Sequence, residues 1–218
     1  MCKVRVRPLQ LSVRRLDREA NYEAVRELAA QGEADLLVLP ELFDTGYLFH
    51  DRKELLSVAT PARGGETCAF LARLARGSGC HVVAGFAERD GPRCFNSAAL
   101  VGPQGLVGLY RKVHLFSAEK ELFAPGDLGF PVFDLGFARV GLMICFDWIF
   151  PEAARTLALR GAQVLAHPAN LVLPWCQAAM ATRALENGVF IITANRIGSE
   201  EVGGRRLTFT GGSQVVGP

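Results

Sequence analysis

The sequence predicts a protein of the α/β class that forms one domain. Short apolar segments with strand character alternate along the chain with longer segments whose apolar residues recur at helical spacing. The length of 218 residues suits one domain, and 50% of the residues are hydrophobic, which suffices for a substantial core. No linker, low-complexity tract or internal repeat divides the chain. We therefore expect a single domain over residues 1–218.

In the first half of the chain, strand and helix patterns end at turn residues. Pro8 in the first strand indicates an edge position, because proline cannot donate to a β-ladder. Pro40 ends the second strand, and Gly102 to Gly105 form the turn of a hairpin. The expected strands cover residues 3–13, 35–43, 81–90, 94–102 and 105–116, and the expected helices cover residues 17–33 and 65–79.

The second half continues the alternation. Two strands are expected within residues 130–144, and Pro151 suits the first turn of the helix that follows. Several connections have hairpin character, so the pattern does not establish a purely parallel sheet. The remaining expected elements are strands over residues 163–169, 189–197 and 207–218, and helices over residues 151–162 and 177–188.

Composition argues against several classes of protein. The formal net charge is +2 and the basic residues are scattered, so neither nucleic acid nor an anionic membrane is the expected partner. No apolar run reaches the roughly 20 residues that a bilayer span needs. The six cysteines lack metal-type spacing, which predicts free thiols in a reducing compartment and a cytoplasmic protein. They are Cys2, Cys68, Cys80, Cys94, Cys145 and Cys176.

Three chemically active side chains follow apolar strand segments. Glu41 ends the segment DLLVLPE, Lys112 ends GLYRK, and Cys145 ends VGLMIC. In open α/β sheets, sites form in the crevice beyond the carboxyl ends of strands. A carboxylate, an ammonium group and a thiol could therefore converge at one place.

Each of these residues also has a structural interpretation. A cysteine after an apolar strand is most often inert core, and a lone lysine or glutamate at a strand end is often solvated. Histidine is the usual base for a cysteine nucleophile, so His50, His81, His114 and His167 are candidates. Spacing excludes neither His114 nor His167 from that role. The residues alone thus leave open a Cys-His hydrolase or amidotransferase.

The contexts of Glu41, Lys112 and Cys145 resemble a known family. VLPELFDTGY, YRKVHLF and MICFDWIFPE, in this order, are similar to the three signature stretches of the nitrilase superfamily of carbon–nitrogen hydrolases. The resemblance is closest to the branch of nitrilases, aliphatic amidases and carbamoyl-amine hydrolases. It extends to the subsidiary stretches ELFAPGD, HPANLVLP, TRALENGVFIITANR and TGGSQVV.

The resemblance implies catalytic roles by position. Cys145 would be the nucleophile, Glu41 the general base, and Lys112 the group that stabilises the tetrahedral intermediate. Glu119 fits the family's second glutamate better than Glu121 does. No metal or organic cofactor is implied. The residues expected at the substrate are Phe116, Phe146 (whose N–H would be an oxyanion donor), Trp148 and Asn170.

The resemblance also implies a fold and a reaction. Relatives form a four-layer αββα sandwich and pair as homodimers through two helices, here those that begin near residues 151 and 176. They continue beyond the TGGSQVV strand, so we expect this chain to lack their C-terminal strand and tail. The implied reaction is hydrolysis of the amide, nitrile or N-carbamoyl group of a small aliphatic molecule through a Cys145 thioester. A catalytically inactive binding protein with this fold is the remaining alternative.

Overall fold

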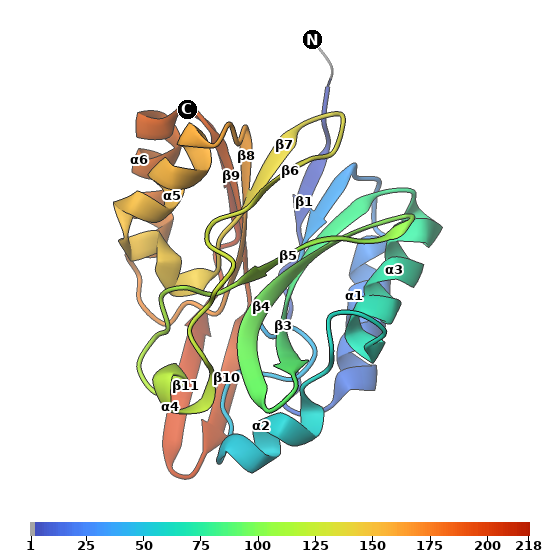
Figure 1. Cartoon of the computed structure of the whole chain (residues 1–218), viewed down its shortest axis with the longest axis vertical. Helices are drawn as coiled ribbons and strands as arrows, with labels where there is room; N and C mark the ends of the chain where they lie inside the picture. The colour runs from blue at the N-terminus through green and yellow to red at the C-terminus, as the bar shows by residue number, and fades with distance from the viewer. Residues whose placement is uncertain (1–2) are drawn as a thin grey trace.

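Two five-stranded β-sheets lie face to face between two pairs of helices in the computed structural model, which describes residues 3–218 (Figure 1). Cys2 lies outside the described residues. The helix–sheet–sheet–helix order confirms the α/β class and the four-layer sandwich. Both sheets mix parallel and antiparallel pairs, as the hairpin signals indicated.

The first sheet has the strand order β1-β2-β3-β4-β5. Its first three strands are parallel, and β3, β4 and β5 form an antiparallel meander whose second turn is the predicted one after Gly102. Pro8 lies in the edge strand, as expected. The strands are β1 (Val6–Pro8), β2 (Leu36–Val38), β3 (His81–Asp90), β4 (Arg93–Gly102) and β5 (Gly105–Arg111).

Helices α1 (Arg18–Ala29) and α3 (Glu66–Ser78) cover the outer face of this sheet (Figure 1). The side chain of Asp17 accepts a hydrogen bond from Ala20 N at the start of α1, and Gly79 ends α3 in the left-handed conformation. Apolar residues of both helices pack on alternate residues of the strands in one buried cluster. The end residues of these helices and their apolar stripes therefore both match the observed positions of the helices.

The second sheet has the order β12-β9-β8-β7-β6. Its central strands β7, β8 and β9 are parallel, and the two edge strands are antiparallel. Helices α5 (Pro151–Leu159) and α6 (Cys176–Asn187) cover its outer face (Figure 1). The strands are β6 (Val132–Asp134), β7 (Arg139–Leu142), β8 (Val164–Ala169), β9 (Phe190–Asn195) and β12 (Gln214–Val216).

The largest core cluster joins the inner faces of the two sheets. Leu36 and Val38 of β2 belong to it together with Val140 and Leu142 of β7, and all four are fully buried. Leu37 lies between them in sequence but packs in the cluster under α1 and α3. Because the side chains of a strand alternate between its two faces, β2 packs against the second sheet on one face and against α1 and α3 on the other.

Some elements were not predicted from the sequence. The expected strand over 189–197 stops at Asn195, and the expected strand over 207–218 is divided into β11 (Arg205–Thr210) and β12. Strand β10 (Ile197–Val202) was not predicted, and it pairs with β11 in a separate ribbon whose turn is Gly203-Gly204. Most of its residues are exposed and polar, so the apolar alternation of a half-buried strand is weak there. The short elements α2 (Arg52–Val58), α4 (Glu119–Leu122) and the 3₁₀-helix Cys145–Ile149 were also missed.

No helix within residues 3–218 combines the length and the apolar character needed to cross a lipid bilayer.

Candidate active site

Glu41, Lys112 and Cys145 come from both sheets. Glu41 follows β2 and Lys112 follows β5 in the first sheet, whereas Cys145 follows β7 in the second. Lys112 Nζ lies 2.6 Å from Glu41 Oε1 and 2.8 Å from Glu119 Oε1. All four side chains are buried. The strand ends therefore converge as the sequence predicted, and Glu119 joins them while Glu121 stays exposed.

Glu41 keeps one carboxylate oxygen free for chemistry. Its Oε1 accepts hydrogen bonds from Lys112 Nζ and, at 2.7 Å, from Asn96 Nδ2, whereas its Oε2 has no partner among residues 3–218. Burial raises the pKa of Glu41, although Lys112 acts against this shift. Gly85 makes room for the residue, because a Cβ there would lie 2.5 Å from Glu41 Cα. Such a carboxylate suits a general base.

Lys112 stays charged in the interior. Burial disfavours its ammonium form, but Glu119 and Glu41 together outweigh burial and raise the pKa of Lys112. Burial also raises the pKa of the Cys145 thiol; Glu41 and Glu119 add to this effect, and Lys112 opposes it. The resting nucleophile is therefore a thiol, and it needs a base when it attacks.

Cys145 lies on a strained turn that Tyr110, Asp147 and His167 hold through hydrogen bonds. It has a φ of 39°, a left-handed value that is uncommon for a residue with a side chain. Asp147 Oδ2 accepts hydrogen bonds from Ile144 N at 2.8 Å and from Tyr110 Oη at 2.7 Å. His167 Nε2 lies 2.9 Å from the carbonyl oxygen of Cys145. These contacts fix the backbone on both sides of the thiol.

His114 and His167, two of the four histidines considered as bases, make hydrogen bonds to the turn that carries Cys145. Burial lowers the pKa of His167 to about 4, so its ring is neutral. Its Nε2–H donates to the Cys145 carbonyl oxygen, and its Nδ1 pairs with Thr193 Oγ1 at 3.0 Å. His114 places Nδ1 2.7 Å from Asp147 Oδ1 and stacks on Phe150. Glu41 is thus the base that the geometry offers.

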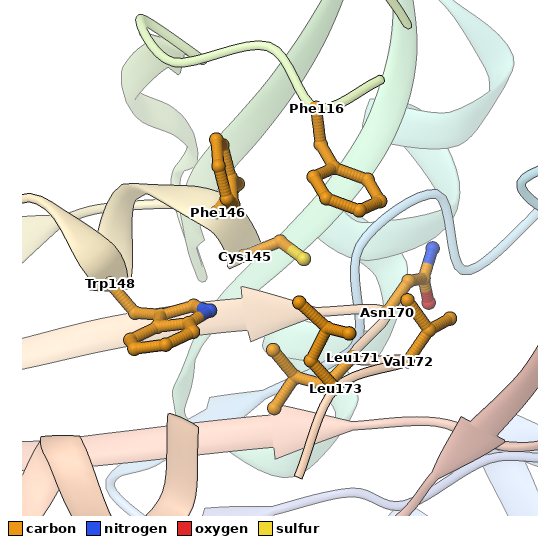
Figure 2. A pocket seen from close by; sticks show the side chains of 8 residues that line it. All are labelled: Phe116, Cys145, Phe146, Trp148, Asn170, Leu171, Val172 and Leu173. Carbon is orange, nitrogen blue, oxygen red and sulfur yellow. The ribbon is translucent and has the colours of Figure 1, made fainter. Parts of the chain in front are cut away.

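A cavity of about 20 Å³ opens beside the thiol (Figure 2). Figure 2 shows the Cys145 sulfur directed into the space between Phe116 and the segment that follows β8. All four residues predicted to line the substrate pocket do line this cavity. With Cys145, the lining residues are Phe116, Phe146, Trp148, Asn170, Leu171, Val172 and Leu173. The last three were not singled out, although they belong to the HPANLVLP stretch.

A second cavity, of about 60 Å³, lies beyond Phe116 and is lined by Tyr47 and Glu119. Tyr47 Oη donates to Glu119 Oε1 at 2.7 Å, and Phe116 N donates to Glu119 Oε2 at 3.0 Å. The backbone N–H groups of Tyr47 and Leu48 donate to the buried carboxylate of Glu200, at 2.9 and 2.8 Å. Strand β10 therefore supports the Glu119 side of the site.

The arrangement can perform acyl transfer. The thiol of Cys145 lines the cavity, and the carboxylate of Glu41, with its free oxygen, and the fixed ammonium group of Lys112 are near enough for their charges to act on the thiol. Phe146 lies in the first turn of the 3₁₀-helix after the thiol, where backbone N–H groups have no partner within the helix. Nucleophile, base and anion stabiliser are the components of covalent hydrolysis.

Known proteins are similar to this chain in sequence over most of its length. A family model described as carbon–nitrogen hydrolase matches residues 5–218. The chain is 53% identical over 219 residues to a nitrilase of Pyrococcus abyssi, covering 99% of this chain and 82% of the relative. It is 38% identical to an (R)-stereoselective amidase of Pseudomonas, with 93% and 74% covered, and 35% identical to an N-carbamoylputrescine amidase of Arabidopsis thaliana, with 89% and 71% covered.

Solved structures agree in fold. An amidase of Nesterenkonia sp. AN1 superposes with a TM-score of 0.83 at 31% identity, covering 99% of this chain and 82% of that one. That structure, of a mutant, carries the acetamide moiety of fluoroacetamide added covalently at the active-site cysteine. A CN-hydrolase superfamily protein of Xanthomonas campestris, with an arsenic adduct in its active site, superposes with a TM-score of 0.86 at 25% identity, with 100% and 83% covered.

Proposed function

The chain belongs to the carbon–nitrogen hydrolase family, and from this premise we propose that it hydrolyses the amide, nitrile or N-carbamoyl group of small aliphatic molecules, with Cys145 as nucleophile, Glu41 as base and Lys112 as stabiliser of the intermediate. One observation carries the assignment of roles. The Lys112 ammonium group is held by Glu41 Oε1 and Glu119 Oε1, while Glu41 Oε2 stays without a partner among the described residues. The protein is an enzyme of the nitrilase and amidase type.

The first half of the reaction acylates the cysteine. Glu41 Oε2 takes the thiol proton while Cys145 Sγ attacks the carbonyl carbon of an amide, which forms an S–C bond and places negative charge on the carbonyl oxygen. Lys112 and the N–H of Phe146 face that charge. The C–N bond then breaks, and ammonia or an amine leaves with the proton that Glu41 returns. The product is a thioester on Cys145.

The second half releases the acid. Glu41 takes a proton from water, and the hydroxide oxygen attacks the thioester carbon. The same two donors stabilise the second tetrahedral intermediate. The C–S bond breaks, the carboxylic acid leaves, and the proton held by Glu41 returns to Cys145. Glu41 is then again a carboxylate and Cys145 a thiol, as in the resting enzyme.

The test measures ammonia release from acetamide, propionamide, the matching nitriles and N-methylurea, together with mass spectrometry after exposure to fluoroacetamide. We expect ammonia from one of the three classes, the amides, the nitriles or N-methylurea, and a covalent adduct on the peptide that contains Cys145. Cys68, Cys80, Cys94 and Cys176 are buried and serve as internal controls. A folded protein that releases no ammonia and carries no adduct would instead support the inactive binding protein.

Glu119→Gln is expected to lower kcat/KM on the order of 10²-fold, because Lys112 loses one of its two anchoring carboxylates. It should also move the acidic limb of the pH profile to lower pH. The base form of Glu41 is required, so activity falls as pH drops through the raised pKa of Glu41, and the charge of Glu119 contributes to that raised pKa. Rates of ammonia release from pH 4 to 9 measure both effects.

Glu121→Gln is the matched control for this substitution. Glu121 is exposed on the same short helix, so its loss should change neither the rate nor the profile. An acidic limb that stays in place in Glu119→Gln, or moves equally in both variants, would contradict the assigned coupling.

We also propose that the enzyme forms a homodimer through α5 and α6. Leu159 and Leu185 on these neighbouring helices are 80% and 70% exposed, and Trp175 before α6 is 61% exposed. Exposed apolar residues gathered on one layer are typical of an interface with a second copy. Light scattering should give about twice the 23.6 kDa of one chain.

Leu185→Glu is expected to weaken that dimer by at least about 30-fold in dissociation constant, since a charge would be buried at the interface. Val107→Glu, on the exposed part of β5 in the other sheet, is the matched control and should leave the mass unchanged. A wild-type protein of single-chain mass at micromolar concentration would refute the dimer.

We further propose a cytoplasmic location. The five cysteines of the described chain are free, which fits a reducing compartment. Immunodetection after cell fractionation tests this, and recovery with exported proteins would contradict it.

A further inference from the structure

Asn96 places a carboxamide on an otherwise apolar face of β4. Ala98 and Leu100, the next two residues on the same face of this strand, belong to the core between the two sheets. Asn96 itself is fully buried, at a position where the alternation of the strand favours an apolar side chain. Burying a carboxamide is unfavourable unless it is hydrogen-bonded, so the contacts of Asn96 indicate its role.

Asn96 contacts both members of the buried ion pair. Its Nδ2 donates to Glu41 Oε1 at 2.7 Å, and its backbone carbonyl oxygen accepts a hydrogen bond from Lys112 N at 2.8 Å. Its Oδ1 has no partner among residues 3–218. An ionised Glu41 requires this orientation of the carboxamide, because Oδ1 turned towards Glu41 would place two acceptors together. The side chain of Asn96 therefore serves the carboxylate of the base.

Asn96 and Lys112 make the two oxygens of the Glu41 carboxylate different. Both residues donate to Oε1, at 2.7 and 2.6 Å, whereas Oε2 has no partner among the described residues. A lysine alone could pair with either oxygen, because the last torsion of a glutamate side chain is soft and roughly two-fold. A second donor, carried by β4, fixes the place of Oε1 and with it the place of Oε2. One oxygen is thus held and the other is left to exchange a proton.

Asn96 is a neutral donor among the charged neighbours of Glu41. Burial raises the pKa of Glu41, and both the charge of Lys112 and the hydrogen bond from Asn96 act against this shift. A carboxamide does not titrate, so its hydrogen bond favours the carboxylate form at every pH. The titratable groups whose charges interact with Glu41 would all remain if Asn96 were replaced. They are Tyr47, Lys112, Glu119, Cys145 and Arg196.

We propose that Asn96 is a positioning residue for the general base, which holds Glu41 Oε1 so that Oε2 is the oxygen that exchanges the proton with the thiol. During acylation the proton passes from Cys145 Sγ to Glu41 Oε2 and then to the leaving nitrogen, while Asn96 keeps both of its amide protons. Asn96 acts through Glu41 and not on the substrate. The inference rests on the proposed function of Glu41 and adds the residue that distinguishes its two oxygens.

Asn96→Leu tests the inference, because leucine has nearly the same shape and no donor. We expect kcat/KM at the wild-type optimum to fall about 10- to 100-fold, since the base loses its fixed orientation. The acidic limb of the pH profile should move to higher pH. Loss of a donor to the charged form raises the pKa of Glu41, so its base form disappears at a higher pH than in the wild type.

The measurement is ammonia release from the preferred substrate between pH 4 and 9. Single-turnover release with enzyme in excess gives the same limb if the variant is too slow for steady-state rates. The direction of the shift is informative, because Glu119→Gln is expected to move this limb to lower pH. A general loosening of the site would not produce two shifts of opposite sign.

Ser97→Ala is the matched control. Ser97 is the next residue of β4, so its side chain lies on the opposite face, where Oγ donates to the buried carboxylate of Glu88 at 2.6 Å. Both substitutions remove a buried donor from a buried carboxylate in the same strand, and urea denaturation should show a loss of stability in each. Only Asn96→Leu should move the acidic limb, and Ser97→Ala should keep kcat/KM within about threefold of the wild type.

The outcomes separate the inference from the proposed function. An acidic limb that stays in place or moves to lower pH in folded Asn96→Leu, or that moves equally in Ser97→Ala, overturns the inference and leaves the proposed function intact. Asn96→Ala replaces Asn96→Leu if circular dichroism shows that the leucine variant does not fold, and it is judged by the same outcomes. Absence of ammonia from every substrate in the wild type overturns both.

Discussion

Cys145→Ala is expected to lower kcat for ammonia release by at least about 10⁴-fold. Alanine removes the only atom to which the acyl group is transferred, and the remaining groups of the site can polarise a substrate but cannot form the covalent intermediate. The fold should persist, because Asp147 and His167 hold the backbone of this turn rather than the thiol. The measurement is steady-state ammonia release on the preferred substrate, with circular dichroism on the same sample.

Cys80→Ala is the matched control. Cys80 is also buried, but it lies between α3 and β3 and lines neither cavity. Its loss should leave kcat within about twofold of the wild type. Turnover in Cys145→Ala at a tenth of the wild-type rate or more would transfer the nucleophile role to another group.

Lys112→Met should affect activity and stability together. Loss of one donor to the intermediate costs about 10²- to 10³-fold in kcat/KM. Loss of a buried ion-pair partner also destabilises the fold by about 3–5 kcal/mol, since Glu41 and Glu119 remain buried without their cation. The pKa of Glu41, already raised by burial, rises further because the opposing effect of Lys112 is gone.

This pKa shift gives the stability loss a definite pH dependence. A carboxyl group whose pKa is higher in the folded than in the unfolded state stabilises the fold less as pH rises, because the unfolded chain then ionises more readily. Urea denaturation should therefore show a larger loss for Lys112→Met at pH 8 than at pH 5. The double variant Lys112→Met/Glu119→Gln should recover part of the stability and none of the activity. Equal stability of Lys112→Met and the wild type at pH 8 would refute the buried triplet.

The apolar patterns of the sequence predicted the core elements well where packing imposes a period, whereas the four-layer arrangement came from the family resemblance. The β2 and β7 segments and the helices α1, α3, α5 and α6 have apolar patterns that burial requires, and they were found. Strand β10 and its pairing with β11 were missed, because most residues of this ribbon are exposed and form no apolar face. Local patterns therefore reveal core elements better than exposed ones.

The candidate site was likewise predicted only in part. Glu41, Lys112 and Cys145 stood out as reactive groups at strand ends, and their roles came from the resemblance of the surrounding stretches. The support of Glu119 by Glu200 through Tyr47 was not predicted, because Tyr47 and Glu200 are 153 residues apart and Glu200 looks like an exposed ribbon residue in the sequence. Asn170 and Asn195 look equivalent in sequence, and only the three-dimensional contacts show which one is free.

The origin of the site in two sheets sets an order of events during refolding. Glu41 and Lys112 are carried by the first sheet and Cys145 by the second, and the core between the sheets joins β2 to β7. Backbone structure within each layer can form before the layers dock, but the thiol meets its base only afterwards. Recovery of catalysis from denaturant should therefore lag behind recovery of the far-ultraviolet circular dichroism signal. The rate at which turnover returns would then report the docking of the two sheets.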